Sequence, residues 1–99
     1  MTKARVLMCP PVHFNVDYEI NPWMQGNLGA VSHDLALRQW EQLREVLGRE
    51  ARIELVAPRA GLPDMVFTAN AGLVFGRQFV PSNFAHPERQ GEREYFARW

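Results

Sequence analysis

The segment 32–49 limits the fold of this chain most strongly, because it is typical of one amphipathic helix set between two short apolar runs. Its apolar residues recur at spacings of four, three and four, so that one helical face would hold Ala36, Trp40, Leu43 and Leu47. Ser32 or Asp34 is suited to cap the start of this helix, and Gly48 is suited to end it. We therefore expect a helix over residues 32–49.

Short apolar segments bounded by proline or glycine predict the strands. Residues 4–9 and 52–57 lie on either side of the helix, and each run stops at a proline. Residues 71–75 and 78–80 are separated by Gly76-Arg77, a pair that fits a type II′ hairpin turn. The sequence therefore predicts two single strands and one hairpin.

A second helix is expected from residue 86 onward. Pro87 would occupy the first helical position and Glu88 the first turn, where both residue types are favoured. One face would then carry Tyr95, Phe96 and Trp99. This face either packs back on the sheet or is covered by further polypeptide.

The order strand, helix, strand, hairpin, helix is that of an α/β domain. A chain of 99 residues fits one domain, and no linker or repeat divides it. Residues 10–31 combine proline, asparagine and glycine with aromatic residues and show no period, so we expect a long loop over the structure. Loops of this length without their own secondary structure are often functional. A second loop is expected over residues 58–64.

Composition excludes several classes of function. The chain has 11 basic and 11 acidic residues and no formal net charge, so it has no electrostatic footprint for nucleic acid or an anionic membrane. No apolar run reaches the roughly 18 residues that span a bilayer, and the one near the start is too short for a signal peptide. The three histidines have no metal-ligand spacing, so neither metal nor cofactor is expected. The single cysteine, Cys9, excludes an intrachain disulfide and suits a reducing cytoplasm.

Cys9 has two interpretations. It ends an apolar strand beside prolines, as a small buried hydrophobic residue does. A nucleophilic thiol would instead need a cation, a metal or a helix start nearby to lower its pKa. The surrounding sequence favours the buried residue.

Four polar residues are candidates for binding. Asp64 lies in a loop just before a strand and Asn70 lies six residues further on, where a carboxylate could hold a planar cation by two parallel hydrogen bonds. Both could equally be turn residues that bond their own backbone. Arg89 could clamp a carboxylate or be a solvated surface arginine. Asn21 precedes a proline and could lie at a site or in a turn.

The same segments resemble the amino-terminal part of the amidinotransferase superfamily. This group includes arginine deiminase, dimethylarginine dimethylaminohydrolase, glycine amidinotransferase and the bacterial arginine dihydrolases. The motifs that carry the resemblance are Met8-Cys9-Pro10-Pro11, the run 14–24 that ends in Asn-Pro-Trp-Met, the run 64–72 (Asp-Met-Val-Phe-Thr-Ala-Asn-Ala-Gly), Glu88-Arg89, and Tyr95-Phe96 with Trp99. The similarity covers essentially the whole chain and is strongest to the arginine dihydrolase branch.

The resemblance implies a fold and a chemistry. The implied fold is the first ββαβ-type module, with the start of the second, of a five-fold pseudosymmetric α/β propeller, so that residues 1–99 form the amino-terminal piece of a catalytic domain. The implied reaction is hydrolysis or transfer of the guanidino group of arginine or a related compound through a cysteine thiouronium intermediate. The implied substrate-binding residues are Asp64 for the guanidinium, Phe67 for a pocket wall, Arg89 for the substrate carboxylate, and Asn21 and Asn70 as asparagines of the site.

Two departures from the family pattern change the expectation. Ala69-Asn70 stands where dimethylarginine hydrolases carry a glutamate-aspartate pair, which makes methylated arginine a less favourable substrate. The family's general acid-base histidine and nucleophilic cysteine come from later modules, so this chain alone is expected to be inactive. It would then need those carboxyl-terminal modules or a self-associating partner. The alternatives are a non-enzymatic module that binds arginine-like ligands or packs on a partner, and a small α/β domain without a ligand.

Overall fold

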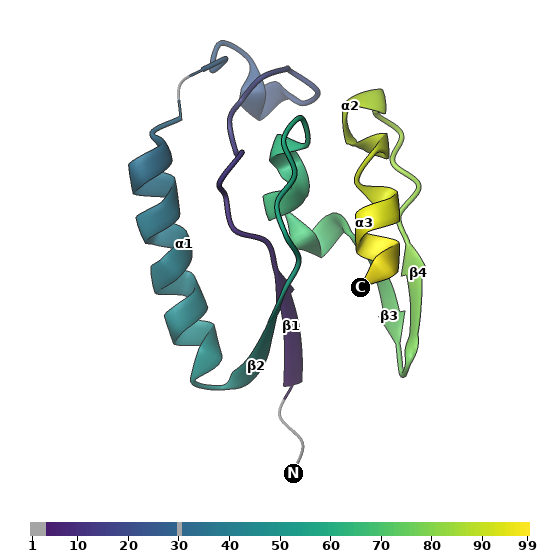
Figure 1. The fold of residues 1–99 in the computed structure, drawn as a ribbon. Coiled ribbons are helices and arrows are strands. Elements are labelled where there is room, and N and C mark those ends of the chain that lie inside the picture. The colour runs from purple at the N-terminus through teal and green to yellow at the C-terminus, as the bar shows by residue number, and fades with distance from the viewer. Residues whose placement is uncertain (1–3, 30) are drawn as a thin grey trace.

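The computed structural model describes residues 4–29 and 31–99, which form a small α/β structure (Figure 1). Its strands and helices are β1 (Ala4–Met8), α1 (His33–Gly48), β2 (Ala51–Leu55), β3 (Gly72–Phe75), β4 (Gln78–Pro81), α2 (Pro87–Gln90) and α3 (Arg93–Arg98). The predicted order of elements is confirmed, and the boundaries of the strands and of the first helix differ from the expected ones by one or two residues.

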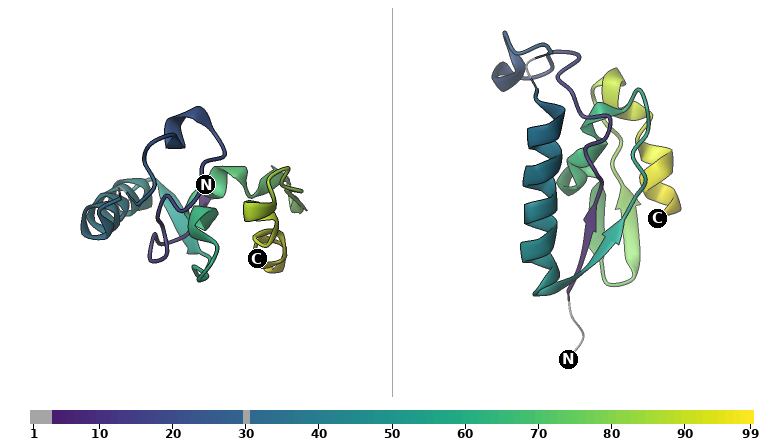
Figure 2. Two further views of the ribbon diagram at one scale, coloured as in Figure 1. Left: turned by 90° about the horizontal axis from the view of Figure 1, so that it is seen from above. Right: turned by 60° about the vertical axis from the view of Figure 1, so that its left-hand side comes forward.

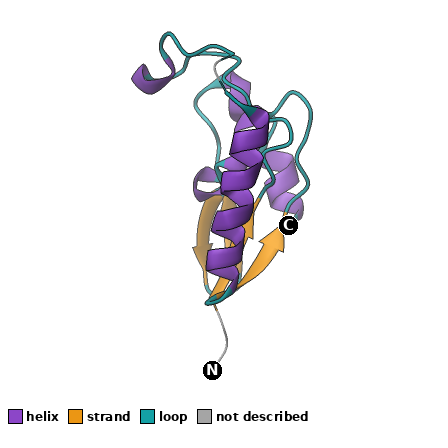
Figure 3. Cartoon of the chain, turned by 90° about the vertical axis from the view of Figure 1, so that its left-hand side faces the viewer, coloured by secondary structure: helices purple, strands orange, loops and turns teal. Residues whose placement is uncertain are grey.

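Strands β1 and β2 are parallel, with Val6 opposite Ile53. Parallel neighbours need a crossover connection, which α1 supplies. Figure 3 shows α1 lying along one side of the strands. The helix begins after Ser32, whose side-chain oxygen accepts a hydrogen bond from the Leu35 N–H at 3.4 Å, and it ends at Gly48 as expected.

The predicted apolar face of α1 is only partly buried. Trp40 is 7% exposed, but Leu43 is 52% exposed, so only part of this face packs on the strands. The reason is the width of the sheet, because β1 and β2 form only two strands beneath a helix of 16 residues. Two strands cover less of a helix than a full layer does.

Strands β3 and β4 form a separate antiparallel hairpin in which Phe75 pairs with Gln78. Gly76 has a φ of 59°, and no non-glycine residue among those described has a positive φ, so Arg77 does not. This combination is that of a type II′ turn, and the predicted turn is confirmed. At the base of the hairpin Gly72 lies so close to Val80 that a Cβ would come within 2.3 Å of its carbonyl oxygen.

The core lies between the end of β1 and the final helix. Its buried residues are Cys9, Met65, Ala71 and Phe96. Figure 2 shows α3 and the hairpin on the side of β1 and β2 that faces away from α1. Phe96 is fully buried in this core, whereas Trp99 is 40% exposed. The final helix therefore packs back on the chain through Phe96.

The expected single helix after residue 86 was wrong in one respect, because it is broken into α2 and α3. The break falls at Gly91 and Glu92. Glycine has low helix propensity, and a Cβ at Gly91 would meet Leu62 at 3.2 Å. Glu92 lies three residues after Arg89 and pairs with it across this junction, which shapes the site described below.

Within the described part of the chain, no helix is long and apolar enough to cross a membrane.

Candidate functional site

A pocket of about 350 Å³ lies between the long loop, the connection from β2 to β3, and α2. All five residues proposed from the sequence line it, namely Asn21, Asp64, Phe67, Asn70 and Arg89. The other lining residues are Phe14, Val16, Ile20, Trp23 and Met24. The fold thus brings together residues that lie far apart in the sequence.

Two consecutive 3-10 turns position the centre of the pocket. The first is Pro63–Val66, and its proline stands at the first turn position, where no N–H is needed. The second is Thr68–Asn70, held to β1 by a 2.8 Å hydrogen bond from the Thr68 hydroxyl to the Leu7 carbonyl. Asp64 therefore lies where the expected loop over residues 58–64 ends in a proline-initiated turn, and this turn buries it at 4% exposure.

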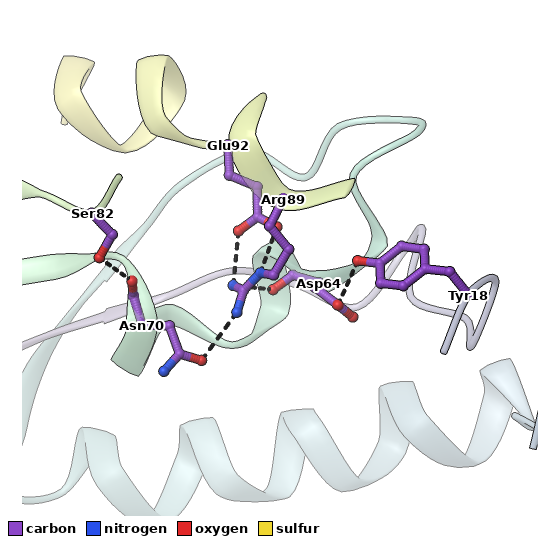
Figure 4. Close-up of polar contacts among 6 residues, drawn as sticks. All are labelled: Tyr18, Asp64, Asn70, Ser82, Arg89 and Glu92. Carbon is purple, nitrogen blue, oxygen red and sulfur yellow. Dashed lines mark hydrogen bonds and ion pairs between the residues drawn. The ribbon is translucent and has the colours of Figure 1, made fainter. Parts of the chain in front are cut away.

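Asp64 is held by the long loop. The Tyr18 hydroxyl donates a hydrogen bond to its carboxylate at 2.5 Å (Figure 4). Across residues 4–29 and 31–99 this is the one hydrogen bond to that carboxylate, so the alternative in which Asp64 caps its own turn does not describe it. Burial raises the pKa of Tyr18 well above its usual value, and the hydrogen bond to Asp64 raises it further. Tyr18 therefore stays protonated and donates at neutral pH.

Arg89 is neither solvated nor free to form a two-pronged clamp. It is 8% exposed, and its Nε and Nη2 donate to the two carboxylate oxygens of Glu92, each at 2.9 Å. Nη2 also donates to the Asp64 carbonyl at 3.0 Å, and Nη1 donates to the Asn70 Oδ1 at 3.2 Å (Figure 4). Four of the five guanidinium N–H groups are thus engaged. One N–H on Nη1 is left for another acceptor.

Glu92 is the residue of this site that was not foreseen. It is fully buried, and burial raises its pKa while the neighbouring Arg89 opposes that rise. The one signal in the sequence was its position three residues after Arg89, a spacing at which helical side chains meet. The structure pairs Glu92 with Arg89 across the junction of α2 and α3.

The remaining site residues border the pocket in different ways. Asn21 accepts a hydrogen bond from the Met24 N–H at 3.1 Å, so its side chain also caps a 3-10 turn, as the alternative reading of Asn-Pro had it. Phe67 is half exposed and packs edge to face on Phe14, with ring centroids 5.5 Å apart. The Asn70 carbonyl accepts a hydrogen bond from the Ser82 hydroxyl. These contacts hold the rim of the pocket.

Cys9 lies in the core and does not line the pocket. Its side chain has no exposed surface, and burial, helped by the negative charge of Glu92, raises the pKa of the thiol to about 11. The thiol is therefore protonated at neutral pH, which confirms the prediction of a buried structural cysteine. The described residues include no group of three His, Cys, Asp or Glu side chains that could hold a metal ion.

Comparison with known proteins gives the chain close relatives, although no family model matches it. It is 54% identical over 98 residues to the bifunctional arginine dihydrolase/ornithine cyclodeaminase AgrE of Nostoc sp., covering 99% of this chain and 14% of the relative. It is 55% identical over 95 residues to the corresponding bifunctional protein ArgZ of Synechocystis sp., covering 96% of this chain and 14% of that protein. The N(G),N(G)-dimethylarginine dimethylaminohydrolase of Mycobacterium tuberculosis is 42% identical over 96 residues, which are 96% of this chain and 32% of that enzyme.

Solved structures give the same result. The crystal structure of an AgrE mutant in a binary complex with L-arginine matches with a TM-score of 0.97 at 54% identity, over 100% of this chain and 15% of that one. The product-bound N-terminal domain of ArgZ, an arginine dihydrolase, matches with a TM-score of 0.96 at 54% identity, over 98% of this chain and 36% of that one. The chain thus spans about a third or less of the curated relatives it matches. It is homologous to the amino-terminal part of the arginine dihydrolases and of dimethylarginine dimethylaminohydrolase, which confirms the resemblance carried by its motifs.

Proposed function

We propose that this chain forms the amino-terminal part of an enzyme that acts on the guanidino group of arginine or a related compound. One observation carries the proposal: the five residues singled out by the sequence line a single pocket. The match to an AgrE mutant crystallised with L-arginine supports the choice of substrate class. On this proposal residues 1–99 supply the first module, and the start of the second, of a five-fold α/β propeller.

The pocket suits a ligand with a cation at one end. Asp64 places a buried carboxylate in the wall, and only one of its oxygens accepts a hydrogen bond from the described residues. We assign Asp64 to the guanidinium and Phe67 to the wall beside it. The remaining N–H of Arg89 Nη1 is assigned to the substrate carboxylate, and Asn21 and Asn70 to the polar rim.

The reaction itself is assigned to groups outside this pocket. A thiolate must attack the guanidinium carbon, and one C–N bond then breaks as a histidine protonates the departing ammonia or amine. Water or another amine, deprotonated by the same histidine, next attacks the thiouronium carbon and releases the thiolate. Cys9 is unsuited to this step, because its thiol is buried and has a pKa of about 11. We therefore assign the nucleophile to carboxyl-terminal modules, because a second copy of this chain would bring only another buried Cys9, and we take the reducing cytoplasm as the place of action.

Binding of L-arginine to the purified chain tests the proposal by isothermal titration calorimetry. Weak binding is expected, and Asp64→Asn should reduce the affinity by about tenfold or more, because a charge-assisted hydrogen bond is lost. Asp17→Asn, at an exposed position of the long loop between β1 and α1, is the control and should leave the affinity unchanged. Equal affinities for wild type and Asp64→Asn would remove Asp64 from the site.

The same preparation tests the expected inactivity. Incubation with L-arginine should release no ammonia above a control without protein, because the one thiol of the chain is buried. Release of ammonia by the chain alone would contradict the assignment of the nucleophile. Arginine binding without turnover, even after later modules are supplied, would favour the alternative of a non-enzymatic binding module.

A further inference from the structure

We propose that Glu92 makes this pocket select a positively charged guanidinium over a neutral group of the same shape. The inference rests on the proposed function, because it concerns the ligand of the same pocket. Glu92 does not line the pocket. It acts through Arg89, whose charge it neutralises, and it is therefore a specificity-determining residue and not a catalytic one.

The first step is the crowding of charge behind the pocket. Asp64, Arg89 and Glu92 are 4%, 8% and 0% exposed, respectively. The Arg89 Nη2 donates to the backbone carbonyl of Asp64 at 3.0 Å, which fixes the guanidinium beside that residue. Charges that are shielded from water act on each other strongly. An unpaired Arg89 would therefore be the countercharge of Asp64 and would oppose the binding of any second cation there.

The second step is the pairing of Arg89 with Glu92. Two parallel hydrogen bonds of 2.9 Å join the Nε and Nη2 of Arg89 to the two oxygens of Glu92. Figure 4 shows the guanidinium between Glu92 and Asn70. Within residues 4–29 and 31–99 both oxygens of Glu92 accept hydrogen bonds from Arg89 alone. The charge of Arg89 is thereby balanced from the core side.

The third step is the charge that remains. The three side chains sum to one negative charge, and the Asp64 carboxylate bonds only the neutral hydroxyl of Tyr18 among the described residues. A carboxylate that lacks a countercharge favours a cationic ligand. A purely stabilising role would not need this pair, since an apolar pair of similar volume commonly stabilises a buried site as well.

Two ligands separate charge from shape. L-arginine and L-citrulline share the amino-acid end and a planar terminal group, but only the guanidino group of arginine is charged. The ratio of their dissociation constants therefore reports the charge preference of the pocket. Contacts to the shared end affect both ligands and cancel in the ratio.

Calorimetric titration of the purified chain with both ligands is the experiment. Glu92→Gln keeps the shape of the side chain and removes its charge, so the preference for arginine over citrulline should fall by about tenfold or more. Glu94→Gln is the matched control, because Glu94 is exposed on α3 and lies 3.9 Å from Arg98. It should leave the ratio at the wild-type value.

A double variant tests the same inference without leaving Arg89 buried and unpaired. Arg89→Met combined with Glu92→Met removes both charges, so absolute affinities should fall while the preference for arginine stays within about threefold of wild type. Circular dichroism checks the fold of each variant. If Glu92→Gln does not fold, the preference of the double variant for arginine over citrulline tests the role of Glu92 instead.

Each outcome has a defined meaning. The role of Glu92 would be overturned if folded Glu92→Gln kept the wild-type ratio of the two dissociation constants, as it would if it lost affinity for both ligands equally. Loss of the preference for arginine in the double variant would overturn it too. Failure of the wild-type chain to bind either ligand would overturn the proposed function and this inference with it. Binding of arginine without any preference over citrulline would overturn the inference alone.

Discussion

At the scale of single residues, burial decides which ionisable groups of this chain can react. Cys9 and Tyr18 both have pKa values raised in the first place by loss of contact with water. The effect on function is opposite in the two cases. A buried thiol is a poor nucleophile, whereas a tyrosine that stays protonated is a dependable hydrogen-bond donor to Asp64.

The pKa of Cys9 predicts a loss of stability at alkaline pH. A folded-state pKa raised to about 11 means that the unfolded thiol, with a pKa of about 8.5, ionises first. The contribution of the protonated Cys9 thiol to the free energy of unfolding is therefore complete below the pKa of the unfolded state. It is lost as the pH rises through the pKa of the folded state. Urea unfolding at a series of pH values should show a decreasing free energy of unfolding over this range.

The control for this prediction is Cys9→Val, which keeps the apolar packing and removes the ionisable thiol. Its free energy of unfolding should fall less steeply over the same range of pH. If the free energy of unfolding fell equally steeply with pH in the variant and the wild type, the thiol would not contribute to this loss of stability. Tyr18→Phe measures separately how much Tyr18, whose pKa is also raised, contributes to the loss of stability.

At the scale of elements, close backbone contacts define the hairpin. The β3–β4 pair is four residues on each side, and its base is the contact between Gly72 and Val80. Ser82 extends the closure, because its N–H donates to the Ala71 carbonyl at 2.9 Å. The hairpin follows directly on the turn that carries Asn70, so its closure helps to place the pocket.

Gly72→Ala should weaken this element. A Cβ there would lie 2.3 Å from the Val80 carbonyl oxygen and 2.8 Å from the Phe79 ring, so the strands must separate. We expect a loss of about 1–3 kcal/mol in the free energy of unfolding, as overpacked sites show. Gly48→Ala is the matched control, since its nearest neighbour would be Ile53 at 3.8 Å and alanine favours the helix. Equal stability of the two variants in urea unfolding would contradict the prediction.

At the scale of the whole molecule, the chain is more extended than a compact domain of its size. Its radius of gyration is 14.2 Å, against about 13 Å for 100 residues in a compact domain. One face of the hairpin consequently exposes Leu73, Phe75 and Val80 at 68%, 80% and 62%. The final helix contributes less to this exposed surface, because its Phe96 is buried in the core while Trp99 is 40% exposed.

This surface predicts self-association of the chain at high concentration. Exposed apolar side chains on adjacent strands favour contact with other polypeptide. Sedimentation velocity should show species larger than a monomer, and the pair Phe75→Ser with Val80→Ser should reduce them. Leu43→Ser with Val46→Ser, on exposed positions of α1, is the control and should have a smaller effect. A single monomeric species at every concentration would refute the prediction.

The sequence by itself determined the kind and order of the elements, because these depend on local features. The spacing of apolar residues predicted α1, prolines stopped β1, and Gly76-Arg77 specified the turn between β3 and β4. The motif around Asp64 and Asn70 also identified candidate residues and the resemblance to guanidino-modifying enzymes. None of these inferences required knowledge of which segments meet.

Only the tertiary structure decided what each candidate side chain contacts. The sequence left Arg89 as a clamp or a surface residue, and the fold instead turned its guanidinium inward onto Glu92. Tyr18 met Asp64 because the long loop crosses the connection between β2 and β3. Such contacts join residues distant in the chain and depend on burial, which no local pattern contains. The charge that remains in the pocket is therefore a property of the folded molecule.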